Sequence, residues 1–188
     1  MVKEAIHGIR GVLRTVTRAV LCVALFGFAA ACQANQSGTE GIVTSNAPSP
    51  RVAAFLGGPT LDVIGGADYV ETYMLKPALA ADPNATGPGA IAGYYWKARG
   101  AALDPASLAE FRRLIMDEGS YDFVNTKKCP MVPEFAFRFV KGGDFVDVLV
   151  SFQCKMWQFE HGPAKKTEDF DPAADRLKAV VETVFKLD

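Results

Sequence analysis

The stretch "FAFRFVKGGDFVDVLVSFQ", Phe135 to Gln153, decides the fold, because it alternates in side-chain character on both sides of a glycine pair. Residues 142–143 suit a two-residue hairpin turn. In that register Arg138 lies opposite Asp147 as a cross-strand ion pair, and a one-residue slip would mix polar residues into the apolar face. The apolar face then consists of Phe135, Phe137, Phe139, Val146, Val148, Val150 and Phe152. The pattern predicts one long antiparallel hairpin.

The opposite face of this hairpin is only partly polar. Phe145, Leu149 and Trp157 interleave there with charged and amide side chains, and they form a candidate binding surface. The alternative is that the chain's own segment Arg51 to Ile64 covers this face. On the docking interpretation, aspartate at Trp157 and Phe145 should abolish partner capture without unfolding the domain.

Two cysteines flank the hairpin. Extending the same register places Cys129 and Cys154 on the apolar face, one diagonal step apart, and two nearby prolines require a bend between them. We therefore expect a Cys129–Cys154 disulfide, which would stabilise a small domain by about 3 kcal/mol. Two separately buried thiols are the alternative.

The remaining elements predict an α+β domain. Strand-like segments cover residues 68–76 and 91–99, and the second hairpin strand can continue through Phe159. Asp104-Pro105 and Asp171-Pro172 each begin an amphipathic pattern typical of a helix. The expected order is β-β-α-β-β-α, an antiparallel sheet of four to five strands with two helices packed on one face.

The beginning of the chain has the features of an export signal. Four basic residues precede a run of 13 uncharged residues, Ala19 to Ala31, which is shorter than the about 20 residues of a membrane span. We expect residues 1–31 to be a signal peptide. Residues 32–50 are rich in small polar residues, as in a flexible tether, and residues 51–188 are left as a single α+β domain.

The end of that run, "AAAC" from Ala29 to Cys32, resembles the lipobox of bacterial lipoproteins. The resemblance implies a lipid on Cys32, and Gln33 implies sorting to the outer membrane. Ordinary cleavage after Ala31 is the alternative, since Ala29 and Ala31 also fit an A-x-A site. Lipidation of Cys32 would leave an even pair of cysteines in an oxidising compartment.

The cysteine region also resembles an uncharacterised exported bacterial family with a C-x-x-x-P … C-F-x-C pattern. Cys129 to Pro133 matches the first element, and Ser151 to Cys154 matches the second, with Ser151 in place of that pattern's first cysteine. The resemblance implies no activity, and the serine argues against a metal or redox site that uses both cysteines.

The residues of the exported part offer few catalytic groups. Removal of the signal leaves 16 basic and 20 acidic residues and one histidine, His161, from the totals of 20, 21 and 2. This excess of acid excludes a typical nucleic-acid binder, and a single histidine argues against a metal site despite the nearby carboxylates Glu160, Glu168, Asp169 and Asp171.

We therefore predict no catalytic residue, metal or cofactor. The chain is expected to be a lipid-anchored envelope protein that faces the periplasm or the cell surface and acts as a non-catalytic binding or structural module. Its predicted partners are the membrane, through the lipid, and another envelope protein. The alternatives are an envelope hydrolase that uses His161 with an acid pair in a deep pocket, and a thiol-redox protein.

Overall fold

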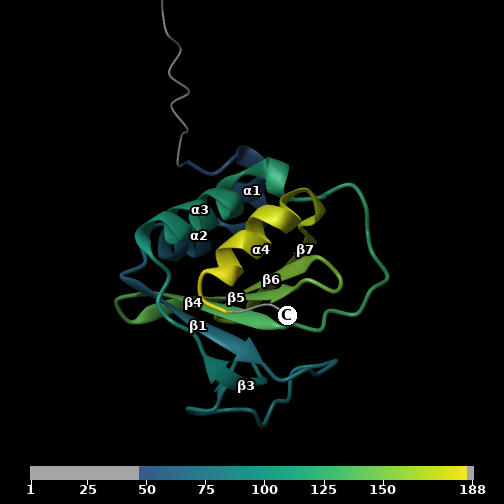
Figure 1. The fold of residues 1–188 in the computed structure, drawn as a ribbon. Helices are drawn as coiled ribbons and strands as arrows, with labels where there is room; N and C mark the ends of the chain where they lie inside the picture. Colours follow the sequence, from purple (N-terminus) through teal and green to yellow (C-terminus); the bar gives the residue numbers. More distant parts are fainter. Residues whose placement is uncertain (1–46, 186–188) are drawn as a thin grey trace, which may run out of the picture. The chain divides into compact units, whose positions relative to one another are not determined.

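The hairpin predicted from the sequence is present in the computed structural model, which describes residues 47–185 (Figure 1). Strands β4 (Phe135–Lys141) and β5 (Asp144–Ser151) pair antiparallel, with Arg138 opposite Asp147. Gly142 occupies the turn with a φ of 58°, a conformation that favours glycine. The predicted register is therefore confirmed.

This hairpin lies in the middle of a seven-stranded antiparallel sheet, whose strand order is β2-β3-β1-β4-β5-β6-β7. The other strands are β1 (Tyr69–Leu75), β2 (Ala90–Ile91), β3 (Tyr94–Arg99), β6 (Met156–His161) and β7 (Ala164–Asp169). The sheet is curled, and the curl brings β3 close to the far strands. Ile91 of β2 and Tyr94 of β3 pack in one buried cluster with Leu149 of β5.

Four α-helices pack on one face of this sheet (Figure 1). They are α1 (Pro50–Leu56), α2 (Gly58–Gly65), α3 (Pro105–Met116) and α4 (Ala174–Glu182), with short 3-10 turns at Glu118–Ser120 and Asp171–Ala173. The Asp104 carboxylate accepts hydrogen bonds from the backbone N–H groups of Ala106 and Ser107, which confirms the predicted cap of α3.

The predicted sheet of four to five strands with two helices is wrong. The structure adds the β6–β7 hairpin, the short strand β2 and the helices α1 and α2. Strand β7 reads "AKKTED" and has no apolar alternation, because it is an edge strand with one buried residue, Asp169. The segment Arg51 to Ile64 lies on the helical side and not over the opposite face of the hairpin.

The main core lies between the helices and the sheet. The predicted apolar row is buried there, and Phe152 is partly buried at its end. Phe111 of α3 packs edge-on against Phe137, with ring centroids 4.8 Å apart. Burial of this continuous apolar face is the main term that stabilises the fold.

Arg112 joins α3 to the end of α2. Its Nε donates to the Ile64 carbonyl at 2.9 Å, and Nη2 donates to the Ala67 carbonyl at 3.0 Å. Arg112→Met should lower the free energy of unfolding by about 2 kcal/mol, because two charge-assisted hydrogen bonds are lost. The neighbouring Arg113 pairs with Glu110 at 2.7 Å on the surface, so Arg113→Met should cost less than about 0.5 kcal/mol. Urea denaturation compares the two variants, and equal losses would contradict this role of Arg112.

Cys129 and Cys154 are paired, with Cα atoms 5.9 Å apart, so the predicted disulfide is present. The predicted reason for it is wrong, because neither cysteine lies on a strand. Strand β5 ends at Ser151, Cys154 lies in the following turn, and Cys129 lies in the loop before β4. The disulfide therefore ties two connecting segments together.

Candidate functional site

The face of the sheet opposite the helices, here called the outer face, is the candidate functional surface. Its first row crosses three strands, where Tyr69, Val140 and Phe145 lie side by side. Tyr69 is 55% exposed and Phe145 is 43% exposed. The Arg138 guanidinium lies 4.2 Å from the centroid of the Phe145 ring, a cation–π contact that orients this ring.

The second row of the outer face is charged. It runs across five strands through Glu71, Arg138, Asp147, Glu160 and Lys165. Arg138 donates two hydrogen bonds to the Asp147 carboxylate, at 2.7 and 2.8 Å. Burial raises the pKa of Asp147, and the hydrogen bonds from Arg138 oppose this shift. Every charge in this row has a partner of opposite sign, so the row positions strands and offers no free acid or base.

The third row of the outer face is covered by the chain itself. Leu149 is fully buried in a second small core with Ile91 and Tyr94, against which Trp96 packs. The cover therefore comes from the β2–β3 region.

Trp157 belongs to the main core. It is fully buried, lies opposite Val150 and packs 4.6 Å from the Tyr121 ring centroid. The turn of residues 152–155 reverses the chain, and β6 therefore directs its odd-numbered residues toward the helices. Of the three residues predicted for a binding surface, only Phe145 is exposed.

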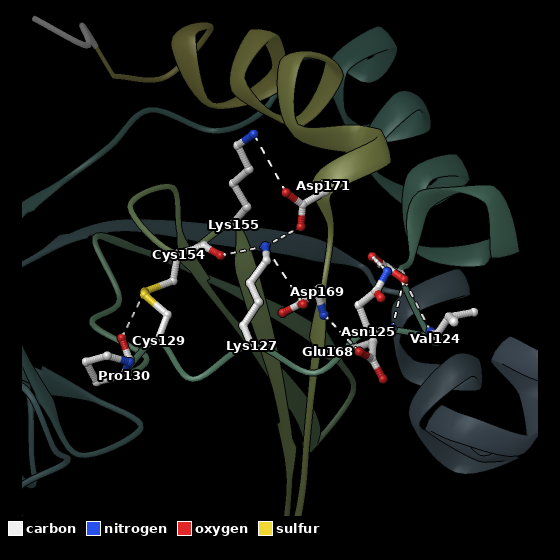
Figure 2. A network of polar contacts seen from close by, with 11 residues as sticks. Val124, Asn125, Lys127, Cys129, Pro130, Cys154, Lys155, Glu168, Asp169 and Asp171 are labelled. Atoms are coloured by element: carbon white, nitrogen blue, oxygen red, sulfur yellow. Dashed lines mark hydrogen bonds and ion pairs between the residues drawn. A yellow bond between two sulfur atoms is a disulfide. The ribbon is translucent and has the colours of Figure 1, made fainter.

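A second polar cluster surrounds Lys127, beside the disulfide (Figure 2). The Lys127 ammonium donates to the Cys154 carbonyl at 2.9 Å, forms an ion pair with Asp171 and lies 3.8 Å from Asp169 Oδ2. Asp169 is 2% exposed, and its Oδ2 accepts no hydrogen bond in the described part of the chain. Lys127 therefore lies between two carboxylates, one of them buried, and Lys155 also pairs with Asp171 at 3.7 Å.

Asp169 predicts a pH dependence of stability. Burial raises its pKa in the folded state. The folded state therefore favours the protonated form of Asp169. This adds to the free energy of unfolding below the unfolded-state pKa, about 3.9, and the added stability is lost as the pH rises through the folded-state pKa. Asp169→Asn removes this titration, so its free energy of unfolding should rise relative to the parent across the pH range in which folded Asp169 loses its proton. Urea denaturation across this range measures the difference.

Asp144 serves as the control, because its pKa is shifted in the opposite direction. A hydrogen bond from His161 lowers the pKa of this carboxyl. Its stabilising effect is present above the unfolded-state pKa and is lost as the pH falls through the folded-state pKa. Asp144→Asn should therefore lose stability relative to the parent as the pH rises. Parallel pH trends for Asp169→Asn and Asp144→Asn would contradict these assignments.

His161 connects three segments at one end of the sheet. Its Nδ1 lies 3.1 Å from the Thr60 hydroxyl of α2, and its Nε2 lies 3.0 Å from the Asp144 carboxylate at the start of β5. A hydroxyl, an imidazole and a carboxylate are thus in line, as in nucleophilic catalysis. Thr60 is only 5% exposed, however, so a substrate would reach this hydroxyl only after the chain moves.

A cavity of about 330 Å³ opens between α3 and α4. Its carboxylate, Glu110, is held by Arg113 and Arg176, and its Ser107 hydroxyl donates to Asp104. The other lining residues are Ala106, Ala179, Val180 and Thr183. Because Glu110 already accepts charged hydrogen bonds, the cavity offers no free general base.

The residues considered for a metal site lie apart. His161 and Glu160 end β6, whereas Asp169 and Asp171 are held by Lys127 at the other end of the sheet. Within residues 47–185, no group of three His, Cys, Asp or Glu side chains has a geometry that could hold a metal ion. No sequence pattern singled out Lys127, although its place two residues before Cys129 was a usable signal.

Comparison with known proteins finds no matching family model, no matching curated protein and no matching solved structure. Among the helices of residues 47–185, none has the length and apolar character needed to cross a bilayer. Residues 1–46, which carry the predicted signal peptide, Cys32 and most of the tether, lie outside the described residues.

Proposed function

We propose that this chain is a lipid-anchored protein of the bacterial cell envelope, with a non-catalytic domain that binds another envelope protein. The sequence Ala29 to Cys32 after an uncharged run supports the anchor. The observation that carries the proposal is the Cys129–Cys154 disulfide, because such bonds persist in oxidising compartments outside the cytosol.

The binding part of the proposal concerns the first row of the outer face. Tyr69 and Phe145 are large aromatic side chains that remain exposed on adjacent parts of one rigid sheet. Aromatic side chains of this kind supply much of the binding energy at protein interfaces. The charged second row beside them would form a polar rim.

Crosslinking in intact cells tests the binding function. The parent protein should form a discrete crosslinked product. The yield of this product should be at least 10-fold lower for a variant with Tyr69→Asp and Phe145→Asp. Val124→Asp is a matched control, because Val124 is 83% exposed in a loop away from this row. Undiminished crosslinking by the double variant would refute the assigned surface.

Cell fractionation tests the anchor separately. Cys32→Ala should move the protein from the membrane fraction to the soluble fraction of the envelope, because a lipidated cysteine supplies the membrane affinity. Retention of the variant in the membrane fraction would refute lipidation at Cys32.

A hydrolase is the second candidate, and the Thr60–His161–Asp144 alignment is the observation that favours it. A fluorophosphonate probe should then label the parent protein but neither Thr60→Val nor His161→Gln. If the parent is not labelled, this hydrolase assignment is excluded.

A further inference from the structure

The loop between the 3-10 turn at Glu118–Ser120 and β4 is long and irregular. It covers residues 121–134 and contains no helix or strand. Loops of this length without secondary structure are uncommon in small domains and often carry function. Its two ends are fixed, since the Asp122 N–H donates to the Asp169 carbonyl and the Glu134 N–H donates to the Val150 carbonyl.

The middle of this loop has few attachments. Within the described chain, residues 123–133 make no backbone-to-backbone hydrogen bond. The Phe123 ring stacks on Tyr121, and Asp122 closes a local turn with the N–H groups of Val124 and Asn125. Phe123 is anchored, because its ring packs edge-on against Phe55 of α1 and its carbonyl accepts a hydrogen bond from Arg51 at 3.3 Å. Further along the loop, Met131 packs against the second core.

Two attachments of the middle of the loop reach Cys154, and Lys127 also forms an ion pair with Asp171. The Lys127 ammonium donates to the Cys154 carbonyl, and Cys129 is bonded to the Cys154 sulfur (Figure 2). These two attachments lie two residues apart in the loop. Loss of the disulfide would leave the Lys127 side chain as the main polar tie of an otherwise irregular segment.

The carboxylate beneath Lys127 is the unusual group. Asp169 is almost fully buried, and its Oδ2 accepts no hydrogen bond from the described residues. A buried polar atom without a hydrogen-bond partner is costly and calls for an explanation. Hydration of this carboxylate would favour an open position of the loop once the covalent tie is broken.

We propose that the Cys129–Cys154 disulfide holds closed a redox-controlled lid, formed by residues 124–133, which opens on reduction and exposes Asp169. The rest of the domain stays folded, because its strands and helices are joined by their own hydrogen bonds and by the main core. The lid therefore opens locally, as low-stability segments of proteins do.

A dithiol reductant supplies the electrons for this step. Cys129 is partly exposed, whereas Cys154 is 4% exposed, so a thiolate of the reductant attacks the Cys129 sulfur. The protein S–S bond breaks, and Cys154 leaves as a thiolate and takes up a proton. The second thiol of the reductant then displaces Cys129, which also becomes a thiol, and two electrons pass from the reductant to the protein.

Limited proteolysis with trypsin tests the lid directly, because Lys127 and Lys128 both lie in it. After treatment of the intact domain with dithiothreitol, we expect cleavage at these lysines to accelerate at least 10-fold. Cleavage after Arg138, in the central strand β4, should not change, and the near-ultraviolet circular dichroism should remain that of a folded protein.

The double variant Cys129→Ser with Cys154→Ser provides the matched control. It should be cleaved in the lid at the fast rate, and dithiothreitol should have no further effect on it. The proposal is overturned if reduction leaves the rate at Lys127 and Lys128 unchanged. It is equally overturned if cleavage after Arg138 accelerates in parallel, because reduction would then unfold the whole domain.

Discussion

Trp157→Asp is expected to unfold the domain or to lower its free energy of unfolding by at least about 5 kcal/mol. Loss of a buried Trp side chain alone costs about 3 to 5 kcal/mol, and the new carboxylate would be buried without a partner. Trp157 is fully buried among Tyr121, Phe159 and Phe170, so no rotation of the side chain brings the charge to solvent.

Phe145→Asp is the matched control for this substitution. Phe145 is 43% exposed, and the Arg138 guanidinium next to its ring can form an ion pair with the new carboxylate. We expect a change of less than about 1 kcal/mol, as for most surface substitutions. Circular dichroism during urea denaturation compares the two proteins. Similar stability of both variants would contradict the inward orientation of Trp157.

Arg138→Met should have the second largest effect, a loss of about 3 kcal/mol. Asp147 is 3% exposed, and removal of its cation leaves a buried carboxylate without its two charged hydrogen bonds. Arg99→Met is the matched control, because the Arg99 side chain is 59% exposed and its pair with Glu71 is solvated. The control should cost less than about 0.5 kcal/mol.

A double-mutant cycle separates the pair from the individual side chains. When Arg138→Met is combined with Asp147→Leu, most of the lost stability should return, since apolar groups often replace a buried ion pair at little cost. Additive losses, with no recovery in the double variant, would show that Asp147 does not depend on Arg138.

The central hairpin could be predicted from the sequence because each local signal agrees with the fold. The glycine turn, the alternating rows and the Arg138–Asp147 pair all require the same register, and the structure has it. The cap of α3 was also visible, since Asp104 stands before a proline and an amphipathic run. The same signal at Asp171 begins only a 3-10 turn, and α4 starts at Ala174 without a side-chain cap. Such elements can be predicted from sequence because their local preferences and their long-range contacts favour the same structure.

The rest of the sheet could not be predicted, because its signals are weak or depend on distant contacts. Strand β7 carries Lys165 and Lys166, which protect an exposed sheet edge from pairing with other chains. The same lysines remove the apolar alternation by which a strand is predicted from sequence. After the turn that follows Ser151, the odd-numbered residues of β6 face the helices, whereas in β5 the even-numbered residues do. That change moved Trp157 from the predicted surface into the core.

The candidate site was only partly visible for the same reason. Phe145 could be identified from alternation within one strand, whereas its neighbour Tyr69 lies far away in the sequence and joins it only through the sheet. The cluster of Lys127, Asp169 and Cys154 depends on two connecting segments and the end of β7, which no periodic pattern places together. Long-range side-chain contacts of this kind leave little trace in a single sequence.

The intact mass of the protein extracted from cell membranes tests the central claim most directly. Our account predicts a chain that begins at Cys32, carries lipid on that residue, and has two hydrogens fewer than the reduced form. Treatment with a dithiol should restore those two hydrogens. A mass that equals the full chain with free thiols and no lipid would contradict export, anchoring and the disulfide together.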